Sequence, residues 1–215
     1  MQETIAGSAT QRAYRALERM IVTLELLPGS VGTEGALIER IGLGRTPVRE
    51  AIQRLAWEGL LEVRARAGIA VAPLRSGDWV KVIDARRGVE LILARSAAKH
   101  ATRDSAKQFQ DAALAMRKAA ISGNVIAFLQ ADKALDEAMA VAADNPYAAR
   151  LAAPLQSHSR RFWFRYQSDT GLAAAADRHM ALIKAILDGD GDEAAKQADR
   201  LMALLRSHAE DAARD

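Results

Sequence analysis

The sequence has no cysteine, which excludes disulfides and thiolate metal sites and suits a reducing cytoplasm. It also has no apolar run of about eighteen residues, the length that a membrane-spanning helix needs. The opening MQETIAGSATQRAY lacks a basic stretch followed by an apolar core, so we expect no secretory signal. These absences predict a cytoplasmic protein without a membrane partner.

Several motifs of enzymes are missing as well. The chain contains no Gly-x-Ser-x-Gly, no His-Glu-x-x-His and no P-loop. We therefore expect that the protein is not an enzyme. An enzyme built on a helical bundle is the less favoured alternative.

Lysine and aspartate are absent from residues 1–75, which carry ten Arg and eight Glu, whereas the net charge of the whole chain is only +3. An all-arginine basic set suits bidentate contact with phosphate or with a guanine edge. A genome whose codons favour arginine would explain the same bias.

Half of the 215 residues are hydrophobic, which is enough for a substantial core in one or two domains. Apolar residues at three- and four-residue spacing predict a helix over residues 8–25. A second, short helix follows from an N-cap at Thr33 to about Gly42. Thr46 is expected to cap a third helix, with Pro47 in its first position.

The hydrophobic period changes to two in LLEVRARAGIAVAPL, which predicts a short β-hairpin that turns at Gly68. Pro73 to Gly77 combines turn residues with a change of composition, so we place a domain boundary there, between residues 1–75 and 78–212. Every long segment after this boundary has helical period. Helices are expected near 78–103, 105–122, 125–143, 146–167, 172–188 and 191–212, with caps at Asn124, Asn145 and Asp190.

The predicted fold class is mainly α, with an N-terminal winged helix-turn-helix followed by an all-α helical bundle. In a winged helix-turn-helix the third helix enters the major groove with its N-terminus first. Arg45 and Arg49 would then meet a groove edge, and the Thr46 hydroxyl would meet a phosphate. Arg64 and Arg66 lie on the hairpin, where a wing with Gly68 at its tip would reach the minor groove or the backbone.

The block LGRTPVREAIQRLAWEGLL, with Leu27-Pro28-Gly29 and Glu34 before it, resembles the DNA-binding domain of GntR-type bacterial transcription regulators. The resemblance covers roughly residues 10–75 and implies binding to a double-stranded DNA operator, with Glu34 among the DNA-binding residues. Such operators are usually two-fold, so a homodimer is expected. Gly35 and Gly44 depart from the family pattern, which has polar side chains there, and each removes a possible DNA contact.

The second half resembles the all-helical effector domain, named FCD, of the regulators related to the fatty-acyl-responsive ones. The matching segments are ARRGVELILARSAAKHAT, FLQADKALDEAMAVAADNPY and DRHMALIKAILDGD. The resemblance implies a helical bundle around a cavity that binds a carboxylate effector. In many members a divalent metal is bound there through Asp-x-x-x-His and two later histidines.

The match to this metal motif is incomplete. Asp132 stands at the aspartate position and His179 at that of the third ligand, but Asp136 and Leu201 replace two histidines. Because Asp132 and Asp136 are one helical turn apart, they lie on the same helix face. Together with His179 they are the candidate metal ligands. A divalent ion such as Mg²⁺, Mn²⁺ or Ca²⁺ would suit this set better than Zn²⁺. The alternative is that the two aspartates are ordinary polar residues and that His179 is a hydrogen-bonded core residue.

Arg86 is the candidate for contact with a small carboxylate effector, together with Asp132 and His179. A salt bridge from Arg86 to Glu90, four residues later, is the alternative. The leading functional prediction is a ligand-responsive DNA-binding regulator that represses a metabolic operon in response to an organic acid. The other candidate is an architectural or constitutive DNA-binding protein without an effector.

Overall fold

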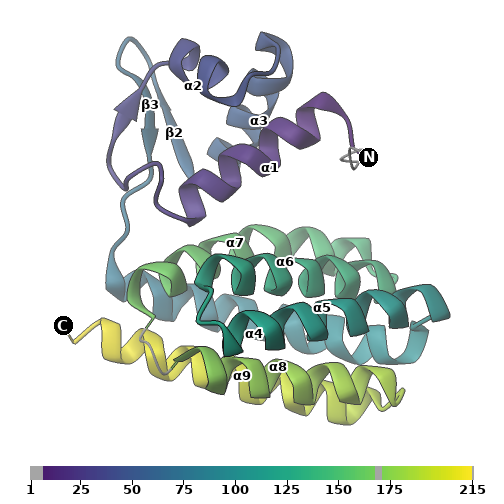
Figure 1. Ribbon diagram of the computed structural model, residues 1–215. Coiled ribbons are helices and arrows are strands. Elements are labelled where there is room, and N and C mark those ends of the chain that lie inside the picture. The colour runs from purple at the N-terminus through teal and green to yellow at the C-terminus, as the bar shows by residue number, and fades with distance from the viewer. Residues whose placement is uncertain (1–6, 168–170, 215) are drawn as a thin grey trace. The chain divides into compact units, whose positions relative to one another are not determined.

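The computed structural model describes residues 7–167 and 171–214 (Figure 1). The first six residues, which contribute to the expectation of no secretory signal, lie outside this range. The chain divides into two compact units, Met1–Arg75 and Ser76–Asp215. Each unit has its own arrangement of elements and is described by itself.

The first unit combines three helices with a small sheet in its described residues. The Ser8 side chain starts the first helix by a capping box with Gln11. This helix ends at Val22, earlier than its apolar pattern predicts, because Leu24 adopts a left-handed backbone with φ +56°. The elements are α1 (Ala9–Val22), β1 (Val31–Gly32), α2 (Glu34–Ile41), α3 (Arg45–Trp57), β2 (Leu61–Arg64) and β3 (Gly68–Val71).

The sheet has the strand order β1-β3-β2, with both pairs antiparallel, in the described part of this unit. The predicted hairpin is β2–β3, but its turn consists of residues 65–67, and Gly68 is the first residue of β3, opposite Arg64. A Cβ at Gly68 would lie 2.5 Å from the carbonyl oxygen of Gly32 on β1. Gly68 is therefore needed where two strands approach closely and does not form the tip of the wing.

The core of the first unit lies between the helices and one face of the sheet. Leu17 of α1, Leu37 of α2 and Leu55 of α3 pack with Ile69 and Val71 of β3, and all five are buried. These are the apolar positions whose spacing defines the helices and the strand in the sequence. Because the apolar face of α3 packs into this core, Arg45 and Arg49 near its N-terminus are exposed.

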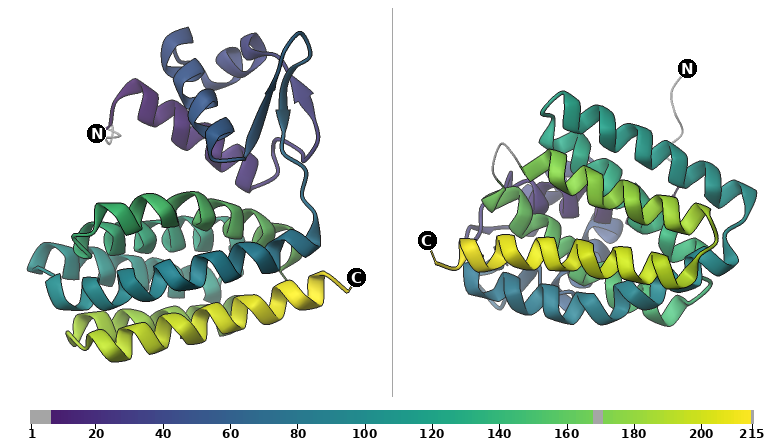
Figure 2. Two further views of the ribbon diagram at one scale, coloured as in Figure 1. Left: turned by 180° about the vertical axis from the view of Figure 1, so that it is seen from behind. Right: turned by 90° about the horizontal axis from the view of Figure 1, so that it is seen from below.

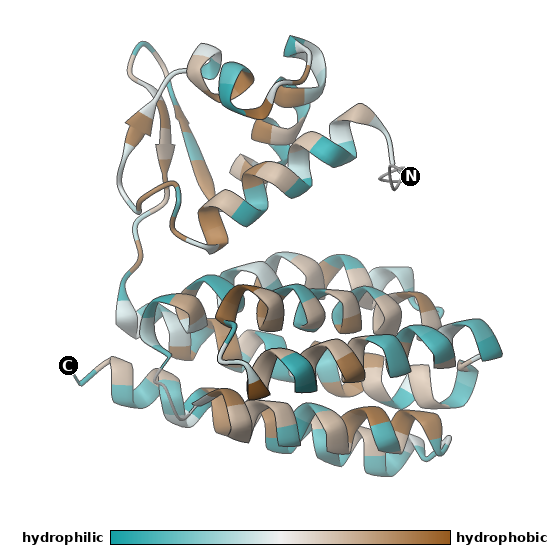
Figure 3. Cartoon of the chain, in the orientation of Figure 1, coloured by the Kyte–Doolittle hydropathy of each residue, from teal (hydrophilic) through white to brown (hydrophobic). Residues whose placement is uncertain are grey.

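The second unit consists of helices and short connections, without a strand in its described residues. Its helix α4 packs along α9 and α7, while α5 packs against α6 and α8 (Figure 2). The helices carry apolar and polar segments in alternation along their length (Figure 3), as expected for a bundle with one shared core. They are α4 (Ser76–His100), α5 (Arg103–Ile121), α6 (Val125–Ala142), α7 (Pro146–Tyr166), α8 (Gly171–Leu187) and α9 (Gly191–Ala212).

Side-chain caps set several starts of these helices. Asn124 accepts a hydrogen bond from the Ala127 N–H, and Asn145 accepts one from the Ala148 N–H, as their sequence positions predict. The carboxylate of Asp190 caps α9 in the same way. None of the helices in the described ranges combines the length and apolar character needed to cross a membrane.

Candidate functional site

The N-terminus of α3 presents a polar, exposed surface. Helix α3 begins at Arg45, and its N-cap is Gly44, which makes no side-chain cap hydrogen bond. The expectation that Thr46 caps this helix, with Pro47 in its first position, is therefore wrong, because both residues already lie within the first turn. Arg45, Thr46 and Arg49 are exposed there. The N–H groups of a first helical turn have no acceptor within the helix, so this end can receive an anion such as a phosphate.

Glu34, at the start of α2, holds Arg49 by two hydrogen bonds. Arg49 Nη2 donates to Glu34 Oε1 at 2.7 Å, and Arg49 Nε donates to Oε2 at 3.1 Å. The hydrogen bond from Arg49 lowers the pKa of Glu34, and the charge of Arg45 acts in the same direction. The structure thus brings together Glu34, Arg45 and Arg49, three residues that the sequence predicts to contact DNA.

The wing carries the two other predicted arginines. Arg64 donates from Nη2 to Glu62 Oε2 at 2.6 Å within strand β2. Arg66 lies in the turn with a left-handed backbone, φ +63°, and is exposed. The turn therefore projects a guanidinium from its tip, as a wing that contacts a phosphate backbone requires.

A buried ion network lies in the helical unit. Helix α4 contributes Arg86 and Glu90, joined by a hydrogen bond of 2.6 Å from Nε to Oε1, and Gln156 of α7 donates to the same Glu90 oxygen at 3.0 Å. Arg86 also reaches Ser159 Oγ at 3.3 Å and Asp136 Oδ1 at 3.5 Å. Every donor nitrogen of Arg86 thus has an acceptor, and the salt bridge to Glu90, the alternative from the sequence, is present.

The other half of the network centres on Arg160 of α7. Its Nη1 donates to Asp136 Oδ2 at 2.5 Å and to Asp132 Oδ2 at 3.3 Å, both on α6. His179 of α8 contacts Asp132 Oδ1 through Nε2 at 2.9 Å and the Ala175 carbonyl through Nδ1 at 2.7 Å. Arg86, Glu90, Asp132, Asp136, Arg160 and His179 are all buried.

The pKa shifts in this network follow from burial and from the neighbouring charges. Burial raises the pKa of Asp136 to about 7, and the charge of Asp132 adds to this shift. Burial acts on Asp132 in the same direction, but His179 and Arg160 outweigh it and lower its pKa. Burial would lower the pKa of His179, whereas its contacts with Asp132 and Ala175 raise it. Because both ring nitrogens of His179 face oxygen acceptors, the geometry suits a ring with two protons.

The cavity beside this network is small. It has a volume of about 20 Å³ and is bordered by Arg86, Asp132, Arg160 and His179, with Phe128 on its apolar side. A space of about 10–15 Å³ is the minimum for one water molecule. In this conformation the side chains of the network therefore fill the centre of the bundle almost completely.

The residues present do not fit a divalent metal. Asp132 and Asp136 already accept hydrogen bonds from Arg160, and Asp132 is joined to His179. The fourth position of the motif is Leu201, a buried hydrocarbon side chain on α9. Among residues 7–167 and 171–214, no group of three or more His, Asp or Glu side chains is placed to hold a metal ion.

Arg160 is the charged residue of this network that the sequence analysis missed, and Gln156 and Ser159 are polar ones. Its signal lies in the spacing Gln156, Arg160 and Trp163, which places all three on one face of α7. The three are buried, and Trp163 stacks with Phe128 of α6 at a ring-centroid distance of 5.4 Å. An arginine on the same helix face as a core tryptophan is expected to have a buried guanidinium.

These elements define a DNA-binding transcription regulator with a winged helix-turn-helix and an all-helical effector domain. Two family models match it: "Bacterial regulatory proteins, gntR family" over residues 9–71, and the FCD domain over residues 81–204. The chain therefore belongs to the GntR family of bacterial regulators and carries an FCD domain. It is a transcription regulator with an FCD effector domain, as the sequence predicts.

Curated relatives include "Probable D-xylose utilization operon transcriptional repressor" of Paenarthrobacter nicotinovorans, 30% identical over 162 residues, which are 75% of this chain and 71% of the relative. "Galactonate operon transcriptional repressor" of Escherichia coli (strain K12) is 29% identical over 211 residues, covering 88% and 91% of the two chains. A Streptomyces ambofaciens regulator is 38% identical over 94 residues, but the match spans 42% of this chain and only 39% of that protein.

Solved structures show the same fold. The E. coli protein McbR/YncC superposes with a TM-score of 0.79 at 18% identity, covering 92% of this chain and 95% of that one. A GntR regulator from Rhodococcus sp. RHA1 has a TM-score of 0.66 at 19% identity, covering 97% of both chains. At this identity the likeness concerns the fold alone.

Proposed function

We propose that this chain is a repressor of an operon for the use of a sugar or a sugar acid, and that it acts in the cytoplasm on a two-fold DNA operator. The names of the xylose and galactonate repressors among its relatives support this class of operon. In this proposal residues 1–75 form the DNA-binding domain. Residues 78–212 form the domain that binds the effector and the second subunit.

The observation that carries this proposal is the exposed group at the start of α3. Arg45 and Arg49 read base edges in the major groove, and Thr46 with the first N–H groups of α3 holds a phosphate. Glu34 orients Arg49 through its two hydrogen bonds. On the wing, Arg64 and Arg66 contact the backbone or the minor groove, and Gly68 keeps β3 close to β1, which fixes the direction of the wing.

A small carboxylate is the proposed effector. Arg86 is the group that receives it, since the partners of Arg86 are carboxylates and a hydroxyl, which a ligand carboxylate can replace with the same chemistry. Asp132 and His179 border the adjoining cavity. Because this cavity is small, the effector enters only when the network rearranges, and such an exchange would couple binding to the packing of α4 against α7.

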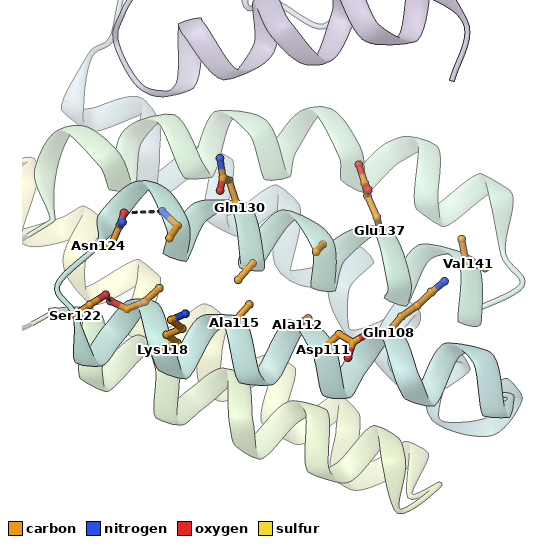
Figure 4. Close-up of a pocket in the computed structure, with 14 residues that line it drawn as sticks. Gln108, Asp111, Ala112, Ala115, Lys118, Ser122, Asn124, Gln130, Glu137 and Val141 are labelled. Atoms are coloured by element: carbon orange, nitrogen blue, oxygen red, sulfur yellow. Dashed lines mark hydrogen bonds between the residues drawn. The ribbon is translucent and has the colours of Figure 1, made fainter. Parts of the chain in front are cut away.

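The second subunit is proposed to cover a groove between α5 and α6 (Figure 4). The groove has a volume of about 880 Å³, and its floor is built largely from alanine side chains such as Ala112, Ala115 and Ala131. On the same two helices, Leu114 and Val141 are 70% and 73% exposed. Small residues allow a close helix-to-helix approach, and exposed apolar groups of this size mark an interaction surface.

The charges at the ends of this groove favour a second copy of the chain as its occupant. Lys118 lies toward one end, and Asp111 and Glu137 lie toward the other (Figure 4). A two-fold axis through the middle of the groove would bring Lys118 of each subunit to the acidic end of the other. A two-fold interface needs such self-complementarity.

The alternative is a constitutive DNA-binding protein without an effector. The small volume of the central cavity favours it. A thermal-shift screen of sugars, sugar acids and other organic acids distinguishes the two, because a ligand that binds only the folded state raises the melting midpoint. Without such a ligand, the constitutive function is the one that stands.

DNA binding is tested separately. Selection from a random double-stranded library, followed by fluorescence anisotropy at fixed salt, yields an operator and the ratio of specific to non-specific affinity. A ratio of about 10³ or more is expected for a specific regulator. Equal affinity for the selected and random DNA would contradict the proposal.

A further inference from the structure

In the centre of the effector domain, one guanidinium nitrogen of Arg160 lies between the carboxylates of Asp132 and Asp136. Arg160 Nη1 lies 2.5 Å from Asp136 Oδ2 and 3.3 Å from Asp132 Oδ2. Two carboxylates one helical turn apart, buried together, repel each other unless a cation lies between them. In this chain that cation is a side chain, supplied by α7 to two residues of α6.

We propose that the guanidinium of Arg160 takes the place of a bound metal ion in this domain, so that the domain assembles, and responds to its effector, without any metal. This inference goes beyond the proposed repressor function and does not depend on the identity of the operon. It rests on the contacts of Arg160 with Asp132 and Asp136, and on the leucine at position 201, where the motif has a histidine.

The first argument is occupancy. A divalent ion bound to both aspartates would have to lie close to Oδ2 of each, where Arg160 Nη1 now lies. Metal-to-oxygen distances of about 2.0–2.2 Å leave no space for a guanidinium at the same point. The charge of Arg160 would also repel the ion, and an arginine does not lose its proton to relieve that repulsion.

The second argument is the identity of the surrounding donors. His179 Nδ1 is bound to the Ala175 carbonyl, and Nε2, which a metal would need, faces Asp132 Oδ1 at 2.9 Å. Leu201 is 3% exposed and presents only hydrocarbon. Arg160 supplies a positive charge between the two aspartates, and Leu201 offers no donor atom at the fourth position of the motif.

A tethered cation has a consequence for regulation. A metal-dependent domain loses its folded or responsive state when the ion is withdrawn, because binding free energy contributes to folding. Here the cation that lies between Asp132 and Asp136 is part of the chain and is always present. The regulator would therefore keep its response when free divalent metal in the cell falls.

The first experiment uses the wild-type chain. After passage over a chelating resin, the protein is mixed with Zn²⁺, Ni²⁺, Mn²⁺ or Mg²⁺, desalted, and examined by elemental analysis and thermal melting. We expect no stoichiometric ion and no change in the melting midpoint. One retained ion per chain, or a rise of about 5–10 °C that Asp132→Asn abolishes, would overturn the proposal.

The second experiment restores the missing histidines in two matched variants. One carries Asp136→His and Leu201→His with Arg160 retained, and the other adds Arg160→Ala. Zinc affinity is measured by competition with a chromogenic chelator, and folding is checked by circular dichroism. We expect the variant without Arg160 to bind one Zn²⁺ at least about a hundredfold more tightly, since the cation no longer competes for the site. Equal affinity in both variants, or zinc binding by neither, overturns the proposal.

A control variant distinguishes the specific effect of removing Arg160 from the general effect of removing one arginine charge. Arg150 lies on the same helix and is exposed, with its guanidinium 5.6 Å from the ring centroid of Tyr147. Adding Arg150→Ala in place of Arg160→Ala should leave the zinc affinity of the doubly substituted chain unchanged. A gain equal to that of Arg160→Ala would show a non-specific charge effect and count against the proposal.

Discussion

Arg49 of α3 and Glu34 of α2 are joined side by side, guanidinium to carboxylate, with N–O distances of 2.7 and 3.1 Å. The residue expected to read a guanine is thus held in one orientation by the preceding helix before any DNA is bound. Arg49→Ala and Arg45→Ala should each lower specific operator affinity by about 1–3 kcal/mol, because each removes one bidentate base contact. Anisotropy titrations at matched salt measure this, and unchanged binding by both variants would disprove the base contacts.

Glu34 itself is expected to act on specificity. Glu34→Gln keeps the size of the side chain and removes the charge that orients Arg49. Specific affinity should fall about two- to fivefold, the range of an exposed ion pair. Non-specific affinity should rise, since one negative charge near the phosphates is lost. Glu39→Gln, an equal change on the same helix, serves as control, and the interpretation fails if both variants behave alike.

The wing arginines are expected to bind DNA without strong sequence preference. Replacing Arg64 and Arg66 with Ala should weaken specific and non-specific binding together and make the slope of log K against log salt shallower by about 1–2 units. Measuring affinity at several salt concentrations gives the slope. The control is the pair Arg19→Ala and Arg54→Ala, which removes the same charge from α1 and the end of α3. Loss of specific binding alone would mean that the wing reads bases.

The positions of the helices follow from the sequence because helical period and caps are local properties. Asn124 and Asn145 cap the helices that they precede, as predicted. In the DNA-binding half, the motif that contains Arg45 and Arg49 forms the predicted third helix. Strand β1 has only two residues, too few to show a period of two. Its place depends on pairing with β3, far along the chain.

The buried network could be predicted only in part, because it depends on which helices meet. Asp132 and Asp136 share a face by spacing alone, and the Arg86–Glu90 pair follows from a separation of four residues. The partner of the two aspartates is Arg160, on another helix and more than twenty residues away. No local pattern reports such a pairing, so the sequence suggests a metal at the point where the structure has a guanidinium.

The groove between α5 and α6 allows a test of the homodimer. Ala115 and Ala134 border it and are exposed. Ala115→Arg or Ala134→Arg would place an unpaired charge in an apolar interface and should raise the dimer Kd at least about a hundredfold. Sedimentation velocity over a concentration series measures this. Ala173→Arg, an equal change on an exposed position of α8, should leave the dimer intact, and a dimer that tolerates all three changes must form elsewhere.

The last prediction compares a buried ion pair with an exposed one of similar chemistry. Glu90 accepts hydrogen bonds from Arg86 and Gln156 in the core. Asp199 accepts two from Arg87 near the surface, one to each carboxylate oxygen. Glu90→Ala leaves the Arg86 charge buried without its main partner, which should cost about 3–5 kcal/mol of folding free energy.

Asp199→Ala removes a pair whose side chains are 55% and 36% exposed, so water can replace the lost contact. It should cost less than about 1 kcal/mol. Urea unfolding followed by circular dichroism measures both, with the m-value checked for two-state behaviour. If the two variants lose equal stability, Arg86 does not need Glu90 in the folded state. The guanidinium would then be available to an effector at little cost.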